Sequence, residues 1–285
     1  MSTFDAMSRV SVPSLSYTQS GPTEGRRVWV LHGIMGSKQN WSRFVRHLSM
    51  RYPALSITSV DLRCHGLTPH FVGPHTVADC AADLDRLGVQ IGYPQAIIGH
   101  SFGGKVALHY AADRSREKDL KGLDRVWTLD SPLSAQPQPG HSEVSRVIAA
   151  CAELPTPQPT RQAVTEYFTA RGFSLGIAQW MTTNLRRLTR DESAEGGFTW
   201  RFDLSGISEL IKSYWQVDGW SLLSEINSDV RLHLLRAERG MRWSQEDAER
   251  IAREAPHVNT PLLADSGHWV HIDQLEALIE LMWEL

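Results

Sequence analysis

The stretch Gly99-His100-Ser101-Phe102-Gly103-Gly104 follows a short apolar run and opens a segment with helical periodicity. The pattern G-x-S-x-G at a junction of strand and helix is typical of a sharp turn that exposes a serine hydroxyl at its tip. Only small residues fit two positions before and after the serine, because such a turn is strained and closely packed. The helix that begins there directs free backbone N–H groups toward the same point. Ser101 is therefore the candidate nucleophile.

On both sides of this turn, short apolar runs alternate with amphipathic stretches. The runs predict strands over residues 28–31, 56–60, 96–98, 126–129, 232–235 and 260–263. The amphipathic stretches predict helices over residues 41–50, 77–87, 102–113, 245–254 and 273–283. This alternation indicates an α/β fold with a mostly parallel central sheet and helices on both faces, and residues 11–17 are a candidate antiparallel edge strand. Ligands bind beyond the carboxyl ends of the strands in such sheets.

The alternation stops between about Pro132 and Leu222, where a Pro-rich stretch is followed by an aromatic-rich region. Helical patterns there cover residues 144–151, 162–171 and 175–188. We therefore expect a core domain made of residues 1–132 and 223–285 and an inserted helical cap at 133–222. Most of the aromatic side chains are expected to pack inside the cap. A pocket between cap and sheet is expected to bind substrate, with Trp200, Trp215 and Met35 as the candidates.

The composition of the chain argues against several classes of protein. The chain has 285 residues and a formal net charge of −3, and this near-balance argues against nucleic-acid binding. No apolar run approaches the length of a membrane span, and no secretory signal is visible. The three cysteines are far apart, which favours a reducing, cytoplasmic location without a disulfide framework. No spacing typical of a metal site is present, so we expect neither metal nor cofactor. The oligomeric state is left open.

A serine nucleophile needs a general base, and the candidate is His268 in Ser266-Gly267-His268-Trp269. Chains with this type of turn carry serine, acid and histidine in that order, and His268 follows the last expected strand. The small residues before it allow its loop to reach back to Ser101. His271 is the main alternative, and His257 precedes the last strand.

Two backbone amides are expected to stabilise the oxyanion. One belongs to Phe102, directly after the nucleophile. The other is expected from the loop after the first apolar strand, Leu31-His32-Gly33-Ile34-Met35-Gly36, whose glycines allow close approach. Ile34 is the preferred donor in that loop, and Met35 is the second choice.

The acid that orients the histidine has two candidates. Asp130 ends the strand before the insertion, whereas the region after the penultimate strand offers only Glu238. We favour Asp130, although aspartate before proline is also common in turns. Asp61 lies in Asp61-Leu62-Arg63, and we expect it to form an ion pair with Arg63 that stabilises the loop. Asp265 and His65 are weaker candidates.

Together these residues resemble the α/β-hydrolase superfamily, and in particular the YbfF-like and ABHD11-like serine esterases. The matching motifs are His32-Gly33, Gly36-Ser37, Asn40-Trp41, Asp61-Leu62-Arg63, His65-Gly66, Gly99 to Lys105, Asp130-Ser131-Pro132, Phe198 to Leu204 and Ser266 to Trp269. The resemblance supports Asp130 as the acid, and Cys64 departs from it. It implies a serine hydrolase of carboxylic esters, including lipid esters or thioesters. An acyltransferase with the same triad, or a ligand-binding protein with little turnover, is the alternative.

Overall fold

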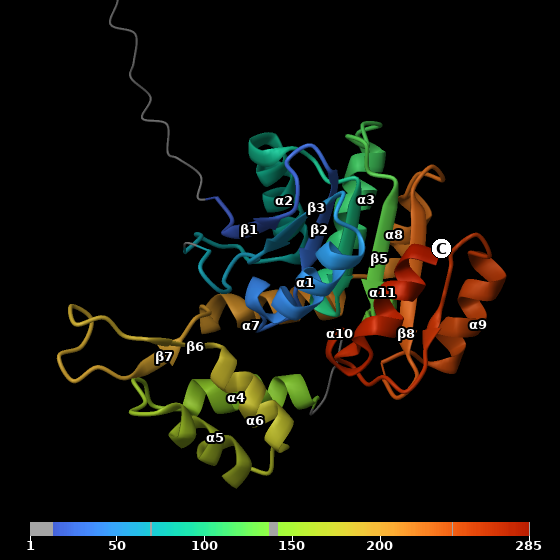
Figure 1. Ribbon diagram of the computed structural model, residues 1–285. Helices are drawn as coiled ribbons and strands as arrows, with labels where there is room; N and C mark the ends of the chain where they lie inside the picture. Colours follow the sequence, from blue (N-terminus) through green and yellow to red (C-terminus); the bar gives the residue numbers. More distant parts are fainter. Residues whose placement is uncertain (1–13, 69, 137–141, 241, 285) are drawn as a thin grey trace, which may run out of the picture.

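The apolar runs form the strands of one twisted sheet. The computed structural model describes residues 14–68, 70–136, 142–240 and 242–284. The strands are β1 (Tyr17–Ser20), β2 (Arg26–Leu31), β3 (Leu55–Val60), β4 (Ala96–His100), β5 (Arg125–Leu129), β8 (Arg231–Ala237) and β9 (Leu262–Leu263). Their order is β1-β3-β2-β4-β5-β8-β9 (Figure 1). Only β1 pairs antiparallel to its neighbour, so the predicted, mostly parallel sheet is confirmed.

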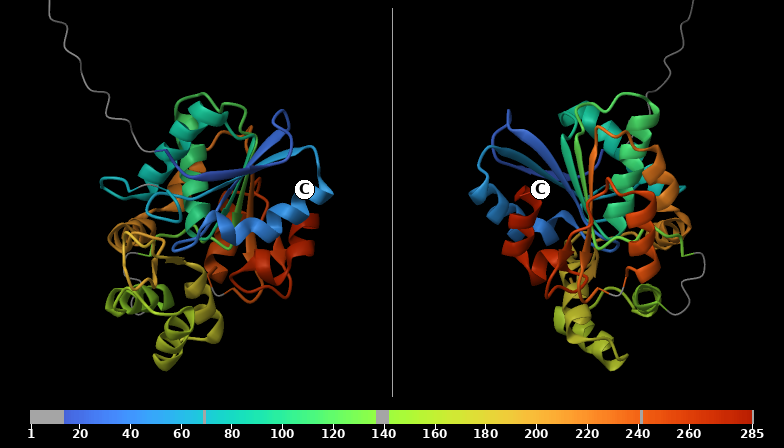
Figure 2. Two further views of the ribbon diagram at one scale, coloured as in Figure 1. Left: turned by 60° about the vertical axis from the view of Figure 1, so that its left-hand side comes forward. Right: turned by 90° about the vertical axis from the view of Figure 1, so that its right-hand side faces the viewer.

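Helices cover both faces of this sheet (Figure 2). The elements around the sheet are η1 (Lys38–Trp41), α1 (Ser42–Arg51), α2 (Val77–Ile91), α3 (Phe102–Arg116), α9 (Gln245–Glu254), α10 (Val270–Asp273) and α11 (Leu275–Glu284). Along β2, Val28 and Val30 pack with α1 and α11, while Trp29 and Leu31 pack with α2 and α3. This alternation follows the two-residue period of a strand. Each such buried side chain contributes about 1.5–3 kcal/mol relative to exposure.

A segment of mixed structure connects β5 to β8. It contains α4 (Glu143–Glu153), α5 (Arg161–Ala170), α6 (Leu175–Thr183), β6 (Leu185–Arg187), β7 (Phe198–Trp200), α7 (Leu204–Gln216) and α8 (Gly219–Glu225). The elements from α4 to β7 lie below the sheet in Figure 1, apart from the helices on its faces. In contrast, α8 packs against α3. The domain boundaries at residues 132 and 222 stay a prediction, and the second of them falls inside α8.

Within this segment the helices expected around residues 144–151 and 162–171 form as α4 and α5. The helix expected over 175–188 ends at Thr183, because Leu185–Arg187 pairs with Phe198–Trp200 as an antiparallel hairpin. The sequence analysis did not anticipate this hairpin, α7 or α8. Strand pairing depends on contacts between distant residues, which a local periodicity does not carry.

Two edges of the sheet also differ from the expectation. The antiparallel edge strand begins only at Tyr17, and residues 11–13 of the expected strand lie outside the described residues. β9 has two residues instead of four, and Pro261, which precedes it, has no N–H for a strand ladder. None of the described helices is long and apolar enough to cross a membrane.

Candidate active site

Ser101 lies at the turn between β4 and α3, with a left-handed backbone φ of 52° and a ψ of −114°. Its glycine neighbours are required by contacts with the backbone. A Cβ at position 99 would lie 2.1 Å from the Gly103 carbonyl oxygen, and a Cβ at position 103 would lie 2.6 Å from that of His32. The turn is therefore as closely packed as the G-x-S-x-G pattern predicts, and it holds Ser101 in a strained conformation.

His268 and Asp130 lie side by side although they are 138 residues apart in the sequence. The distance from His268 Nδ1 to Asp130 Oδ2 is 2.7 Å. Asp130 is fully buried at the end of β5, and the Ala237 N–H donates to its other oxygen, Oδ1, over 3.4 Å. Ser101 and His268 line one cavity of about 670 Å³ at the carboxyl ends of the strands. Ser101 and His268 therefore face the same cavity, and Asp130 contacts His268 behind it.

The loop that carries His268 is fixed by several hydrogen bonds. The ring of His100 donates from Nε2 to the His268 carbonyl oxygen over 2.7 Å. The Gly267 N–H donates to Asp273 over 2.7 Å, and the Ser266 hydroxyl donates to the Leu263 carbonyl over 2.8 Å. The imidazole of His268 therefore sits on a loop with little freedom, which suits a group that must hold one orientation.

The two alternative histidines lie in different surroundings. His271 is buried and stacks on Trp41 at 4.3 Å, and its Nδ1 has no hydrogen-bond partner among the described residues. His257 is exposed and does not line the cavity. Of the three, only His268 pairs with a carboxylate in the part of the chain that is described.

Burial sets the protonation of the pair. Burial lowers the pKa of His268 to about 3, and the positive charge of Arg242 adds to this effect. Burial also raises the pKa of Asp130 to about 6, opposed by the Ala237 N–H and by Arg242. At pH 7 the carboxyl group is ionised and the imidazole is neutral. The imidazole can therefore accept a proton, as a general base must.

The other acid candidate, Glu238, is far less suited to orient a histidine. Its side chain is exposed and accepts a hydrogen bond of 2.8 Å from the Asp265 N–H. Asp265 is in turn contacted by Arg239. No contact joins Glu238 to His268 among the described residues, so its environment is that of a surface carboxylate.

The loop after β2 turns tightly beside Ser101. The Gly36 N–H donates to the Gly33 carbonyl over 3.0 Å, and Met35 has a positive φ of 55°. The Met35 N–H already donates to His65 Nε2 over 2.9 Å. Ile34 and Phe102 line the cavity together with Ser101, and the N–H of Phe102 begins α3 without an acceptor inside the helix. This arrangement favours Ile34 over Met35 as a free donor.

Two buried histidines hold this loop in place. The ring of His32 accepts from the Leu62 N–H at Nε2 over 3.1 Å, and its Nδ1 donates to the Gly33 carbonyl over 2.8 Å. The ring of His65 bonds in the same way, from Nδ1 to the Arg63 carbonyl over 2.8 Å. Burial lowers the pKa of both, so each is neutral. His65 therefore supports the loop as a structural group.

The prediction that Asp61 and Arg63 pair with each other is wrong, because each has a different partner. Asp61 bonds Lys38, whose Nζ lies 2.6 Å from Oδ2, and Arg63 pairs with Asp83 at 2.6 Å. All of these groups are largely buried. The two charges of this loop thus stabilise it separately, each with a partner supplied by a different element.

Of the three substrate-binding candidates, only Trp215 lines the cavity, beside Trp180 and Trp269. Trp200 stacks on Phe202 at 5.1 Å and packs against Phe168, and Met35 is fully buried. Neither Trp200 nor Met35 is among the described residues that form the cavity wall. Their placement therefore argues against a direct contact with substrate.

We expect Trp215→Ala to enlarge the cavity and to shift the preferred acyl chain of p-nitrophenyl esters by two or more carbons. Trp200→Ala is the matched control, since it removes the same indole from a site outside the cavity wall. The ratios of kcat/KM across a series of chain lengths measure the shift. A Trp200→Ala profile that moved as far as that of Trp215→Ala would contradict this assignment.

Tyr214, which lines the cavity, and Lys105, which contacts it, are two residues that the sequence analysis did not single out. Lys105 is almost fully buried, and its ammonium group donates to three main-chain oxygens, of Val217 at 2.8 Å and of Ser134 and Tyr214 at 3.2 Å. It also lies 4.6 Å from the centre of the Tyr214 ring. Burial lowers the pKa of Lys105 to about 8. This lysine therefore connects α3, the helix that begins after Ser101, to the end of α7.

One group of possible metal ligands occurs away from Ser101. Cys64, His75 and Asp203 place one ligand atom each within 4.8 Å of the others. Burial raises the pKa of the Cys64 thiol to about 12, so the sulfur carries its proton at neutral pH. Since a thiolate is the form that binds metals, a metal ion at this group would have to displace the proton of Cys64.

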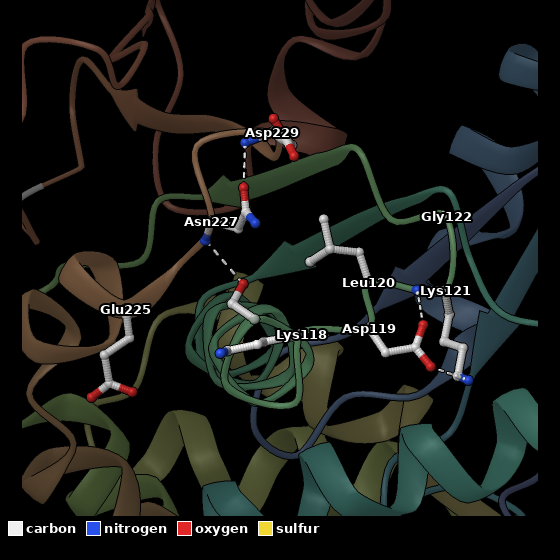
Figure 3. Close-up of a pocket in the computed structure, with 9 residues that line it drawn as sticks. Lys118, Asp119, Leu120, Lys121, Gly122, Glu225, Asn227 and Asp229 are labelled. Carbon is white, nitrogen blue, oxygen red and sulfur yellow. Dashed lines mark hydrogen bonds and ion pairs between the residues drawn. The ribbon is translucent and has the colours of Figure 1, made fainter.

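A second hollow, of about 780 Å³, lies at the far end of α3 (Figure 3). Its polar groups bond one another: Lys121 pairs with Asp119, and the Asn227 N–H donates to Ser115 Oγ over 2.9 Å. Ser115 follows Ser101 by almost the whole length of α3, roughly 20 Å at 1.5 Å per residue. This hollow is therefore separate from the site around Ser101.

Comparisons with known proteins agree with this fold. Residues 30–281 match the model of the family described as "Alpha/beta hydrolase family". The chain is 28% identical over 270 residues to a Xenopus tropicalis protein named sn-1-specific diacylglycerol lipase ABHD11, covering 92% of this chain and 79% of the relative. It is 24% identical to Escherichia coli esterase YbfF, covering 88% and 89%. A solved marine microorganism esterase superposes with a TM-score of 0.81 at 20% identity, covering 95% and 99%.

Proposed function

Because this chain belongs to the alpha/beta hydrolase family, we propose that it is a carboxylesterase-type serine hydrolase that cleaves esters through an acyl-enzyme on Ser101. The observation that carries the proposal is the 2.7 Å contact between His268 and the buried Asp130 at the cavity that Ser101 lines. Relatives named diacylglycerol lipase and esterase support carboxylic esters, including lipid esters, as the substrate class.

In the proposed mechanism, His268 takes the proton of Ser101 while the serine oxygen attacks the ester carbonyl. The N–H groups of Phe102 and Ile34 hold the oxyanion. His268 then protonates the leaving alcohol, and a water activated by the same imidazole releases the acid and restores Ser101. Asp130 keeps the proton of the neutral imidazole on Nδ1 and stabilises the imidazolium. The inserted segment acts as a lid over the cavity, and Trp215 contacts the substrate.

Rapid mixing with a p-nitrophenyl ester tests this mechanism. We expect a burst of p-nitrophenol close to one equivalent of enzyme, together with an acyl adduct on the Ser101 peptide in the mass spectrum. Turnover with added glycerol separates hydrolysis from acyl transfer, since a hydrolase passes most acyl groups to water. Dominant transfer to glycerol would identify an acyltransferase, and adduct formation without turnover would identify a ligand-binding protein.

The pH profile of kcat/KM is expected to fall on the acid side below about pH 6. Burial raises the pKa of Asp130 to about 6, so the Asp130–His268 pair takes up a proton as the pH drops through that value. A protonated pair cannot accept the proton of Ser101, and each further pH unit costs about tenfold. Initial rates between pH 4 and 9 measure this acid-side decrease in kcat/KM. A flat profile down to pH 4 would exclude this pair as the base.

A further inference from the structure

The cavity around Ser101 has an uneven distribution of charge. Four of its lining residues are histidines whose pKa values burial lowers, so they are neutral at pH 7: His32, His100, His268 and His271. Arg242 is the remaining basic residue of the lining, and a guanidinium stays charged at any ordinary pH. Among the described residues, it is therefore the only permanent cation of the cavity wall.

Arg242 is half-buried, yet no described residue offers it a hydrogen bond or an ion pair. The two buried arginines of the described residues are paired, Arg63 with Asp83 and Arg114 with Asp85. Arg125 and Arg236 are half-buried without an ion pair to a described residue, as Arg242 is, but neither lines this cavity. The two acidic residues of the cavity lining, Glu143 and Asp273, are exposed, and Asp273 accepts the Gly267 N–H. The N–H donors of this guanidinium are therefore left available to an anion bound in the cavity.

The position of Arg242 links it to the reaction. Its loop approaches Asp130 so closely that a Cβ on Gly240 would lie 2.8 Å from the Asp130 Oδ2. The charge of Arg242 lowers the pKa of both Asp130 and His268. A cation there opposes the imidazolium that forms when His268 takes the proton of Ser101. An anion bound to Arg242 would remove this opposition, so the arrangement serves a charged substrate better than a neutral one.

We propose that Arg242 binds a carboxylate carried by the substrate, so that the preferred esters of this protein are anionic. This inference rests on the proposed ester hydrolysis and names its substrate class. The planar guanidinium offers paired N–H donors that match the two oxygens of a carboxylate. The apolar walls formed by Ile34, Val147 and Ile211 then hold the uncharged part of the same molecule.

Two pairs of esters test the inference. Mono-4-nitrophenyl adipate and 4-nitrophenyl hexanoate share six acyl carbons and a leaving group, and differ in a terminal carboxylate. 4-Hexanoyloxybenzoate and its methyl ester place the charge on the alcohol side instead. We expect kcat/KM to favour the anionic member of at least one pair by about tenfold or more, the gain typical of a charge-assisted hydrogen bond. The favoured pair tells which side of the ester faces Arg242.

Arg242→Gln is expected to lower kcat/KM for the favoured anionic ester by about 10- to 100-fold. For the neutral partner, kcat/KM should not fall, since no charged contact is lost and the charge that opposes the imidazolium of His268 is removed. Arg242→Lys keeps the charge but not the planar guanidinium. Its kcat/KM for the anionic ester should therefore lie between those of the parent protein and Arg242→Gln. Arg239→Gln is the matched control, because Arg239 lies on the same loop, is exposed and pairs with Asp265. Equal losses on both esters, or none on either, would overturn the inference.

Binding gives a measurement that does not depend on turnover. Calorimetry compares adipate binding to Ser101→Ala with binding to the double variant Ser101→Ala/Arg242→Gln, and we expect about tenfold weaker binding or more in the second. If neither ester pair is hydrolysed but adipate binds through Arg242, ester hydrolysis fails and anion recognition stands. If esters are hydrolysed without charge preference and adipate binds both variants alike, anion recognition fails and the hydrolase stands.

Discussion

Ser101→Ala should abolish ester hydrolysis, with a loss on the order of 10⁵- to 10⁶-fold in kcat, because no other group can form the acyl-enzyme. It should also abolish covalent labelling by a fluorophosphonate probe, which reacts with an activated serine hydroxyl. The turn around position 101 is held by Gly99 and Gly103, so the smaller alanine fits without a new contact. Gel fluorescence of the labelled protein and initial rates measure the two effects.

Ser131→Ala is the matched control for this variant. Ser131 is also buried near the ends of the strands, and the interaction of its side chain is with Tyr214. Its removal should leave labelling and hydrolysis within about threefold of the parent protein. Undiminished labelling of Ser101→Ala would show that another residue is the nucleophile.

Asp130→Asn should lower kcat by on the order of 10⁴-fold, about 5.4 kcal/mol of barrier, while the protein stays folded. In the present structure, Oδ1 of Asp130 accepts the Ala237 N–H and Oδ2 faces His268 Nδ1. An asparagine that keeps the first bond turns its NH₂ toward His268. The imidazole must then accept at Nδ1 and carry its proton on Nε2, where it cannot take the proton of Ser101.

Glu238→Gln provides the comparison. The Glu238 carboxylate is exposed and accepts only from the Asp265 N–H among the described residues, so we expect a loss below about tenfold, or 1.4 kcal/mol. Thermal unfolding of both variants must match, so that the rates report on chemistry alone. A larger loss for Glu238→Gln than for Asp130→Asn would transfer the orienting role to Glu238.

The features that were predictable from the sequence depend on neighbours along the chain. The turn at Ser101 follows from steric limits within five residues, and the G-x-S-x-G pattern records these limits directly. The position of Asp130 follows from its place at the end of an apolar run. The parallel sheet follows from the alternation of runs and amphipathic stretches.

The features that were missed depend on contacts between distant residues. Asp61 and Arg63 are close in sequence, but their partners Lys38 and Asp83 come from η1 and α2. Trp200 and Trp215 look alike in sequence, and only packing decides that the second faces the cavity. Arg242 follows β8 in a loop without a recognisable pattern. Its role emerges only once the cavity wall is assembled from separate elements.

The attachment of α7 to α3 through Lys105 has a consequence for how such enzymes diversify. All three acceptors of its ammonium group are main-chain oxygens, which every amino acid supplies. Side chains around α7 can therefore be substituted, in evolution or in a laboratory library, without loss of these three hydrogen bonds. Substrate preference can therefore change while the hydrogen bonds of Lys105 between α3 and α7 are kept. Insertions or deletions that move the end of α7 are the changes that selection should reject.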